Sequence, residues 1–186
     1  ATGGTLVATG TSYTTPNLSA TTDYYVEAVA NGCKSATRTK VTATVNTTPT
    51  ITKTTSGSRC GAGTVSLSAS ASAGTISWYS NVTGGTPLTT GTIYEPNVSA
   101  TTTYYVDATN NGCTTGSRVA VAAVVNPLPI AYTVTGSGTY CAGGTGLVVG
   151  LDNSEIGVSY QLQLGGSNNG NAVTGTGNAI SFGTKT

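Results

Sequence analysis

The residues that could carry chemistry in this 186-residue chain are few. It has no histidine, which removes the imidazole that acts as general base in Ser–His–Asp and Cys–His sites. The six carboxylates are scattered, whereas a glycosidase needs two of them flanking one bond. Between residues 49 and 128 the only acids are Glu95 and Asp107. Glu95 lies in an expected turn and Asp107 at an outward strand position, so we interpret both as solvated surface charge and expect no enzyme.

Two other segments resemble binding loops only in part. The run 152–155, Asp-Asn-Ser-Glu, offers oxygens for calcium but lacks the spaced acidic ladder and glycine of a dedicated loop. The glycine-rich run 165–170 lacks the Gly-Lys-Ser/Thr ending of a phosphate loop and a following helix, so it predicts a flexible hairpin loop. Cysteines without CxxC spacing or histidine disfavour a zinc site. We expect no metal and no cofactor.

Two tyrosines are candidates for a binding surface. Tyr25 and Tyr105 occupy outward positions of expected strands and could form part of a sugar- or protein-binding face. Tyrosine is also simply a favourable strand residue, which is the plainer interpretation. A Lys53–Asn126 isopeptide cross-link of the kind found in some adhesin domains is a weaker candidate, because no acid is clearly placed beside the pair.

Composition indicates strands and excludes two partner classes. Only 7% of residues are charged, against about a quarter in typical globular chains, and Thr, Ser, Gly, Ala and Val replace them. Thr and Val favour pleated strands. A net charge of +1 without clustered Lys and Arg argues against nucleic acid. The sequence has no basic amphipathic stretch and no apolar run of about 20 residues, so we expect no direct membrane insertion.

An internal repeat organises the chain. Residues 17–26 read NLSATTDYYV and residues 97–106 read NVSATTTYYV, with eight of ten positions identical. The offset of 80 residues then holds from 31–33 to 111–113, Asn-Gly-Cys in both copies. A period near 80 is too long for a solenoid repeat of about 20–50 residues and fits a small β-sandwich domain.

Prolines near residues 49 and 127–129 mark the boundaries, because proline lacks the N–H that continues a strand ladder. We therefore expect residues 1–48 to be the C-terminal part of one repeat and 49–128 a complete repeat. Residues 129–186 would be the N-terminal part of a further, divergent repeat.

Period-two alternation places about seven short strands in the complete repeat. Gly84-Gly85 predicts a turn, and Asn111-Gly112 predicts a two-residue hairpin turn with positive φ at both positions. The residues expected to point into the core are Val65, Leu67, Ala69, Ile76, Trp78, Tyr104, Val106, Ala108, Val119, Val121, Ala123 and Val125.

The order Cys60, Trp78, Cys113 is typical of immunoglobulin domains. The fold class expected is therefore all-β, with tandem immunoglobulin-like β-sandwich domains of about seven strands each. Cys60 precedes its strand and Cys113 follows a turn, so a bond between them would staple one end of the sandwich rather than cross the core.

We expect a Cys60–Cys113 disulfide, with Cys33 and Cys141 unpaired within this chain because their partners belong to neighbouring repeats. Closing a loop of about 50 residues would stabilise the fold by roughly 4 kcal/mol. Such a bond implies an oxidising compartment. Four reduced thiols are the alternative.

The segments ISWYSN, TGGTPLTTGTIYEPNVSATTTYYVDATNNGC and VAAVVNPLPI resemble Ig-like repeats of very large surface proteins of gliding Bacteroidota. The resemblance covers residues 1–130, and residues 131–186 resemble a second repeat type less specifically. It implies export by the type IX secretion system, an extracellular cell-surface location, and a structural, adhesive stalk in an adhesin linked to gliding motility. The partners implied are neighbouring repeats, surface polysaccharide, or the secretion or gliding machinery.

Two other functions stay open on the sequence. A carbohydrate-binding or spacer module of a secreted polysaccharide-degrading enzyme would show exposed aromatic residues in a flat cluster. A self-assembling surface fibre would complete one subunit with a strand from the next. A buried Trp78 would favour the stalk.

Overall fold

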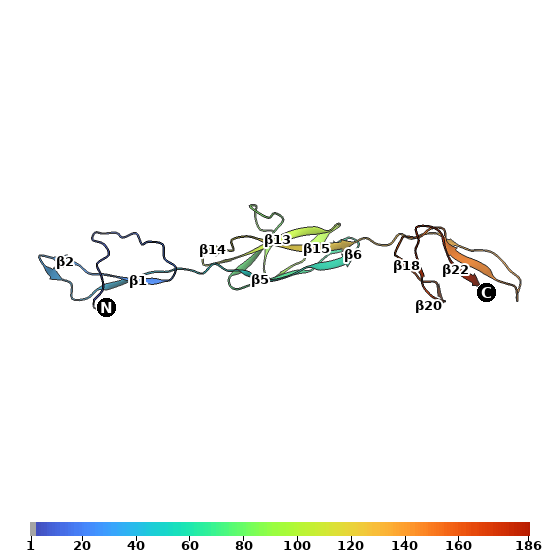
Figure 1. The fold of residues 1–186 in the computed structure, drawn as a ribbon, viewed down its shortest axis with the longest axis horizontal. Helices are drawn as coiled ribbons and strands as arrows, with labels where there is room; N and C mark the ends of the chain where they lie inside the picture. The colour runs from blue at the N-terminus through green and yellow to red at the C-terminus, as the bar shows by residue number, and fades with distance from the viewer. Residues whose placement is uncertain (1–2) are drawn as a thin grey trace. The chain divides into compact units, whose positions relative to one another are not determined.

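The structure is a computed structural model that describes residues 3–186. Its regular elements in that range are all β-strands (Figure 1), which confirms the all-β class. Nothing in the described chain is a helix capable of crossing a membrane. The chain divides into two compact units, Ala1–Val125 and Asn126–Thr186. The first unit holds the first two repeats and the second holds the divergent segment.

The first repeat is a short antiparallel ladder with a hairpin. Its strands are β1 (Thr22–Val26), β2 (Val29–Ala30), β3 (Cys33–Lys34) and β4 (Thr39–Ala43). β1 pairs with β4, and β2 with β3. Asn31 and Gly32 connect β2 to β3 with φ of 50° and 80°, the conformation that a two-residue hairpin requires.

The second repeat, expected at residues 49–128, forms a two-sheet sandwich. Its strands are β5 (Ile51–Thr55), β6 (Gly57–Cys60), β7 (Gly63–Thr64), β8 (Leu67–Ala71), β9 (Thr75–Tyr79), β10 (Thr89–Thr90), β11 (Ile93–Tyr94), β12 (Asn97–Val98), β13 (Thr102–Asn110), β14 (Cys113–Thr114) and β15 (Val119–Asn126). One sheet has the order β10-β9-β13-β15-β6, with β14 added to β13, and the other has the order β11-β8-β5. A small β12-β7 pair borders them.

The leading segment changes sheets between β5 and β6. β5 pairs with β8 in the smaller sheet, whereas β6 adjoins β15 in the larger one. Gly57 stands at this crossing, and a Cβ there would lie 2.3 Å from the carbonyl oxygen of Ser66. The backbone can therefore make the crossing only with glycine at this position.

The core lies between the two sheets. Ten buried residues form it, namely Val65, Leu67, Ala69, Ile76, Trp78, Val98, Val106, Ala108, Val121 and Ala123. Trp78 is fully buried, and its indole N–H donates to the Gly91 carbonyl at 2.9 Å. Tyr94 packs beside Trp78 with ring centroids 5.6 Å apart and makes an edge contact with Tyr104 at 5.0 Å.

Strand registers define two ends of the second repeat, which we call the N-pole and the C-pole. The N-pole holds Ile51, Ala71, Thr75, Thr109 and Cys113, since Ile51 pairs with Ala71, Thr75 with Thr109, and Asn110 with Cys113. The C-pole holds Cys60, Gly63, Val98, Thr102 and Asn126. There Gly63 pairs with Val98, just before β13 begins at Thr102, and β15 ends at Asn126. Figure 1 shows β14 and β6 at opposite ends of this repeat.

Of the residues expected to point into the core, nine are buried, and Tyr104 and Val125 are half-buried and pack against them. Val119, the first residue of β15, is the exception and is 37% exposed. Asp107 alternates outward as expected, yet it is only 5% exposed. Our interpretation of Asp107 as solvated surface charge is therefore wrong, for the reason given in the next subsection.

The second unit builds on three short sheets. Its strands are β16 (Val134–Thr135), β17 (Leu147–Leu151), β18 (Ser159–Tyr160), β19 (Gln163–Leu164), β20 (Ser167–Asn168), β21 (Val173–Thr174) and β22 (Ile180–Lys185). Leu151 and Ile180 are buried and face one another across the β17–β22 pair. Buried Ser154 donates to the Asn178 carbonyl at 2.5 Å and accepts from the Thr176 amide at 3.0 Å. Tyr160 is half-buried and does not take the central place of Trp78.

Candidate functional site: a clamped loop and two cysteine poles

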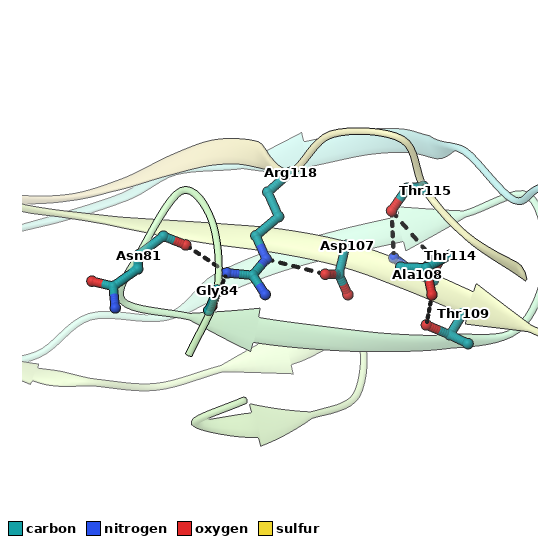
Figure 2. Close-up of polar contacts among 8 residues, drawn as sticks. All are labelled: Asn81, Gly84, Asp107, Ala108, Thr109, Thr114, Thr115 and Arg118. Atoms are coloured by element: carbon teal, nitrogen blue, oxygen red, sulfur yellow. Dashed lines mark hydrogen bonds and ion pairs between the residues drawn. The ribbon is translucent and has the colours of Figure 1, made fainter. Parts of the chain in front are cut away.

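An arginine clamps a loop over the outer face of the larger sheet in the second repeat (Figure 2). Arg118 precedes β15 and donates from Nε to Asp107 Oδ2 at 3.1 Å. Its Nη1 donates to the carbonyl oxygens of Asn81 at 2.8 Å and Gly84 at 2.7 Å. The loop between β9 and β10 is thereby tied to the middle strand of the sheet. Asp107 is buried because this arginine and this loop cover it.

The guanidinium also stacks on an aromatic ring. Arg118 Cζ lies 3.2 Å from the ring centroid of Tyr79, a cation–π contact. Tyr79 pairs across the strands with Tyr105. The side chains of Arg118 and Asp107 are 12% and 7% exposed, so the ion pair is largely shielded from water and from salt screening. One oxygen, Asp107 Oδ1, is buried without a hydrogen-bond partner among the described residues.

The first repeat carries the same clamp 80 residues earlier. Arg38 Nε donates to Glu27 Oε2 at 2.8 Å, and Arg38 also donates to the Gly3 carbonyl. Lys34 Nζ lies 3.4 Å from the same carboxylate. The Arg38 hydrogen bond lowers the pKa of Glu27 despite some opposing desolvation. The 80-residue repeat aligns Arg38 with Arg118. The signal that could have identified the clamp from sequence is the acidic residue eleven positions before each arginine, Glu27 in one copy and Asp107 in the other.

A hydroxyl fixes the hairpin at the N-pole. Thr115 Oγ1 accepts from the Ala108 amide at 3.0 Å, and Thr109 and Thr114 share a hydroxyl contact at 2.9 Å (Figure 2). Asn111 and Gly112 adopt φ of 47° and 79°, so the predicted hairpin turn is confirmed. In the first repeat, Ser35 Oγ accepts in the same way from the Ala28 amide at 3.2 Å. This hairpin holds the cysteine that follows the turn at the very end of the sandwich.

The four cysteines, all within the described residues, are free. Cys60 lies at the C-pole and Cys113 at the N-pole, with the nine residues of β13 between the two ends. At about 3.4 Å per residue this is a separation of about 27 Å, whereas the α-carbons of disulfide-bonded cysteines lie within about 7 Å of each other. The structure therefore does not support the expected Cys60–Cys113 bond. Cys33 and Cys141 are free and exposed.

A protein-family profile described as "Ig-like domain CHU_C associated" matches residues 1–46 and, as a separate copy, residues 47–127. The chain belongs to this family. These Ig-like repeats are a domain of type IX-secreted proteins of Bacteroidota. No curated protein is significantly similar to the chain.

In these Ig-like repeats the two candidate tyrosines take equivalent positions on different copies. Tyr25 lies in β1 and is 43% exposed, and Tyr105 lies in β13 and is half-buried. Tyr105 neighbours Tyr79, whose ring is covered by Arg118. The structure does not bring Tyr25 and Tyr105 together within one Ig-like repeat.

The other candidate segments of the chain have structural partners. Asp152 Oδ1 accepts from the Thr133 amide at 3.0 Å, and Glu155 accepts from the Ile130 amide. No metal-binding cluster of His, Cys, Asp or Glu occurs in the part of the chain that the structure describes. Gly165 and Gly166 form the turn between β19 and β20, with φ of 58° and 82°, so the predicted hairpin loop is confirmed.

Depressions on the surface of the repeat are shallow. One of about 230 Å³ is lined by β5 and Val119 at the open edge between the two sheets. This is below the roughly 300–1,000 Å³ of typical small-molecule sites. Arg118 and Asp107 form an ion pair with each other, and the remaining Arg118 hydrogen bonds hold a loop in place. The role of this site is therefore structural.

Proposed function

We propose that these Ig-like repeats are structural, adhesive stalk segments of a large extracellular adhesin linked to gliding motility. Under this proposal the chain has no catalytic role and is located at the cell surface after type IX export. Its family membership supports the secreted, surface-exposed setting.

One observation carries the proposal: the second repeat receives its chain at one end and releases it at the other. β5 begins at Ile51 at the N-pole, and β15 ends at Asn126 at the C-pole. The repeat therefore extends the polypeptide by about the length of β13, which is about 27 Å for nine residues. A domain with both ends on the same side would add mass to the protein without lengthening the stalk.

The buried residues agree with this assignment and weigh against sugar binding by the second repeat. Trp78 is fully buried, so it cannot form part of a flat aromatic platform. Tyr79 is covered by the Arg118 guanidinium, and its neighbour Tyr105 is half-buried. A carbohydrate-binding module would need such rings free to stack on a sugar.

The experiment compares replacement of a stalk segment with its removal. In the producing bacterium, residues 47–126 are replaced by an unrelated sandwich domain that also has its termini at opposite ends, or are deleted. We expect replacement to preserve adhesion to a surface and deletion to weaken it, because only deletion shortens the stalk. Loss of adhesion on replacement would contradict the proposal.

A binding control separates the stalk from a carbohydrate-binding module. The purified chain and its Tyr105→Ala variant are each incubated with insoluble cellulose, chitin and the host's own surface polysaccharide. We expect no retention of either protein. Retention of the unmodified chain that is lost in Tyr105→Ala would support the carbohydrate-binding function instead.

A further inference from the structure

The two cysteines of the second repeat lie at opposite poles, each beside a connection to a neighbouring segment. At the N-pole the Cys113 thiol donates to the carbonyl oxygen of Asn46, with Sγ and O 3.8 Å apart. Asn46 also donates from Nδ2 to the Asn111 carbonyl at 3.1 Å. The incoming linker is therefore in direct contact with the hairpin that carries Cys113.

At the C-pole the arrangement is similar but uses other strands. Cys60 ends β6, which adjoins β15, and β15 ends at Asn126, where the chain leaves the repeat. Ser56 Oγ accepts from the Ala122 amide at 3.3 Å, which places the start of β6 beside the middle of β15. Both segments then run toward the C-pole, and Cys60 is exposed there.

The linker between two copies is short. With an 80-residue offset, the strand equivalent to β5 begins five residues after the end of β15, as Ile51 follows Asn46. Five extended residues span at most about 17 Å. In consecutive copies, the Cys60 of the first and the Cys113 of the second therefore stand on either side of one short linker.

We propose that consecutive copies of this repeat are cross-linked by a disulfide between Cys60 of one copy and Cys113 of the next. This inference rests on the poles of the repeat and not on the proposed stalk function. Two thiols lose two protons and two electrons to an external disulfide such as oxidised glutathione, which leaves as two thiols while one S–S bond forms. An offset of 80 puts the partner of Cys113 twenty-one residues before Ala1 and that of Cys60 at position 193, so neither pair is contained in these 186 residues.

The test uses a two-copy protein, residues 47–126 followed by residues 47–128. All ten core residues lie between residues 65 and 123, so each copy contains its own hydrophobic core. The protein is equilibrated in a glutathione redox buffer, free thiols are alkylated, and peptides are identified by mass spectrometry. We expect Cys60 of the first copy joined to Cys113 of the second, with the other two cysteines alkylated. A bond inside one copy, a bond between molecules, or four alkylated thiols would overturn the proposal.

Matched variants identify the cysteine that matters. Cys60→Ser in the first copy alone should abolish the cross-link, whereas Cys60→Ser in the second copy alone should leave it intact. Equal effects of the two variants would overturn the assignment. Because both remove one exposed thiol at the same site, a difference between them cannot come from folding.

A second measurement uses the intact 186-residue chain. Asn46→Cys places a thiol in the linker beside Cys113, and in the same buffer it should bond to Cys113 and leave Cys60 alkylated. If Cys113 instead remains free while Cys60 is consumed, the placement of the poles is wrong and the proposal fails with it. Neither result depends on whether the protein acts as a stalk.

Discussion

Asp107 and Arg118 show how a residue on the outer face of a sheet becomes buried. The carboxylate occupies an outward position of β13, yet the arginine and the loop over it leave its side chain 7% exposed. Removing one partner of a buried pair leaves a desolvated charge, which typically costs about 3–5 kcal/mol. Replacing only one residue of the pair therefore measures the free-energy cost of leaving the other without its partner.

We expect Arg118→Ala to lower the stability of the second repeat by about 3 kcal/mol, because Asp107 and two loop carbonyls lose their donor. Trp78 is the only tryptophan, so its fluorescence during urea unfolding measures this repeat alone. Arg38→Ala, which breaks the equivalent clamp of the first repeat, is the control and should leave the Trp78 midpoint unchanged. The double variant Asp107→Leu with Arg118→Met should regain most of the loss. A single-variant loss below about 0.5 kcal/mol would show that water already satisfies the pair.

At the scale of strands and turns, local patterns predicted most of the sandwich. The alternation of Ile76 and Trp78 in β9 and the Asn111-Gly112 turn are properties of a few adjacent residues, and the structure has both. The burial of Asp107 depends on Arg118 and a loop more than twenty residues away, so alternation within one strand could not reveal it. The expected Cys60–Cys113 bond depends on distant parts of the chain in the same way: β5 and β6 both run toward the C-pole and carry Cys60 there, whereas the hairpin after β13 holds Cys113 at the N-pole.

Gly74 is a turn position where the structure makes a graded prediction. Its φ is 82°, and a Cβ would lie 2.2 Å from the carbonyl oxygen of Thr109, whereas Gly84 has φ of 64° with open space around it. Gly84→Ala should cost about 1 kcal/mol through backbone strain alone. Gly74→Ala should cost more than twice as much, because β13 must also shift. Urea unfolding followed by Trp78 fluorescence compares them, and equal losses would show that the turn between β8 and β9 relaxes freely.

At the scale of the whole chain, two units carry separate cores. The buried core of the second repeat ends at Ala123, and that of the second unit includes Leu151 and Ile180. The second unit begins at Asn126, just after the last core residue of the second repeat. Each unit is therefore stabilised by its own core, and destabilising one unit need not destabilise the other.

We expect Ile180→Ala to destabilise the second unit by about 2–4 kcal/mol through the cavity it leaves. The Trp78 unfolding midpoint should stay the same, while methyl NMR signals of Leu151 report an earlier transition. Val121→Ala, in the core of the second repeat, is the reciprocal control and should shift Trp78 alone. A shift of both probes by the same amount in either variant would show that the units unfold as one.

The placement of the chain's two connections at opposite poles has a mechanical consequence. Tension on the second repeat pulls β5 and β6 from the N-pole and β15 from the C-pole, and β6 and β15 are neighbours in one sheet. Both strands run from the N-pole to the C-pole, so the load acts along them and at right angles to the hydrogen bonds between them. Those bonds must then break together in shear rather than one after another, as they would if the strands were peeled apart. The sheet change at Gly57 makes β6 the strand that bears this load.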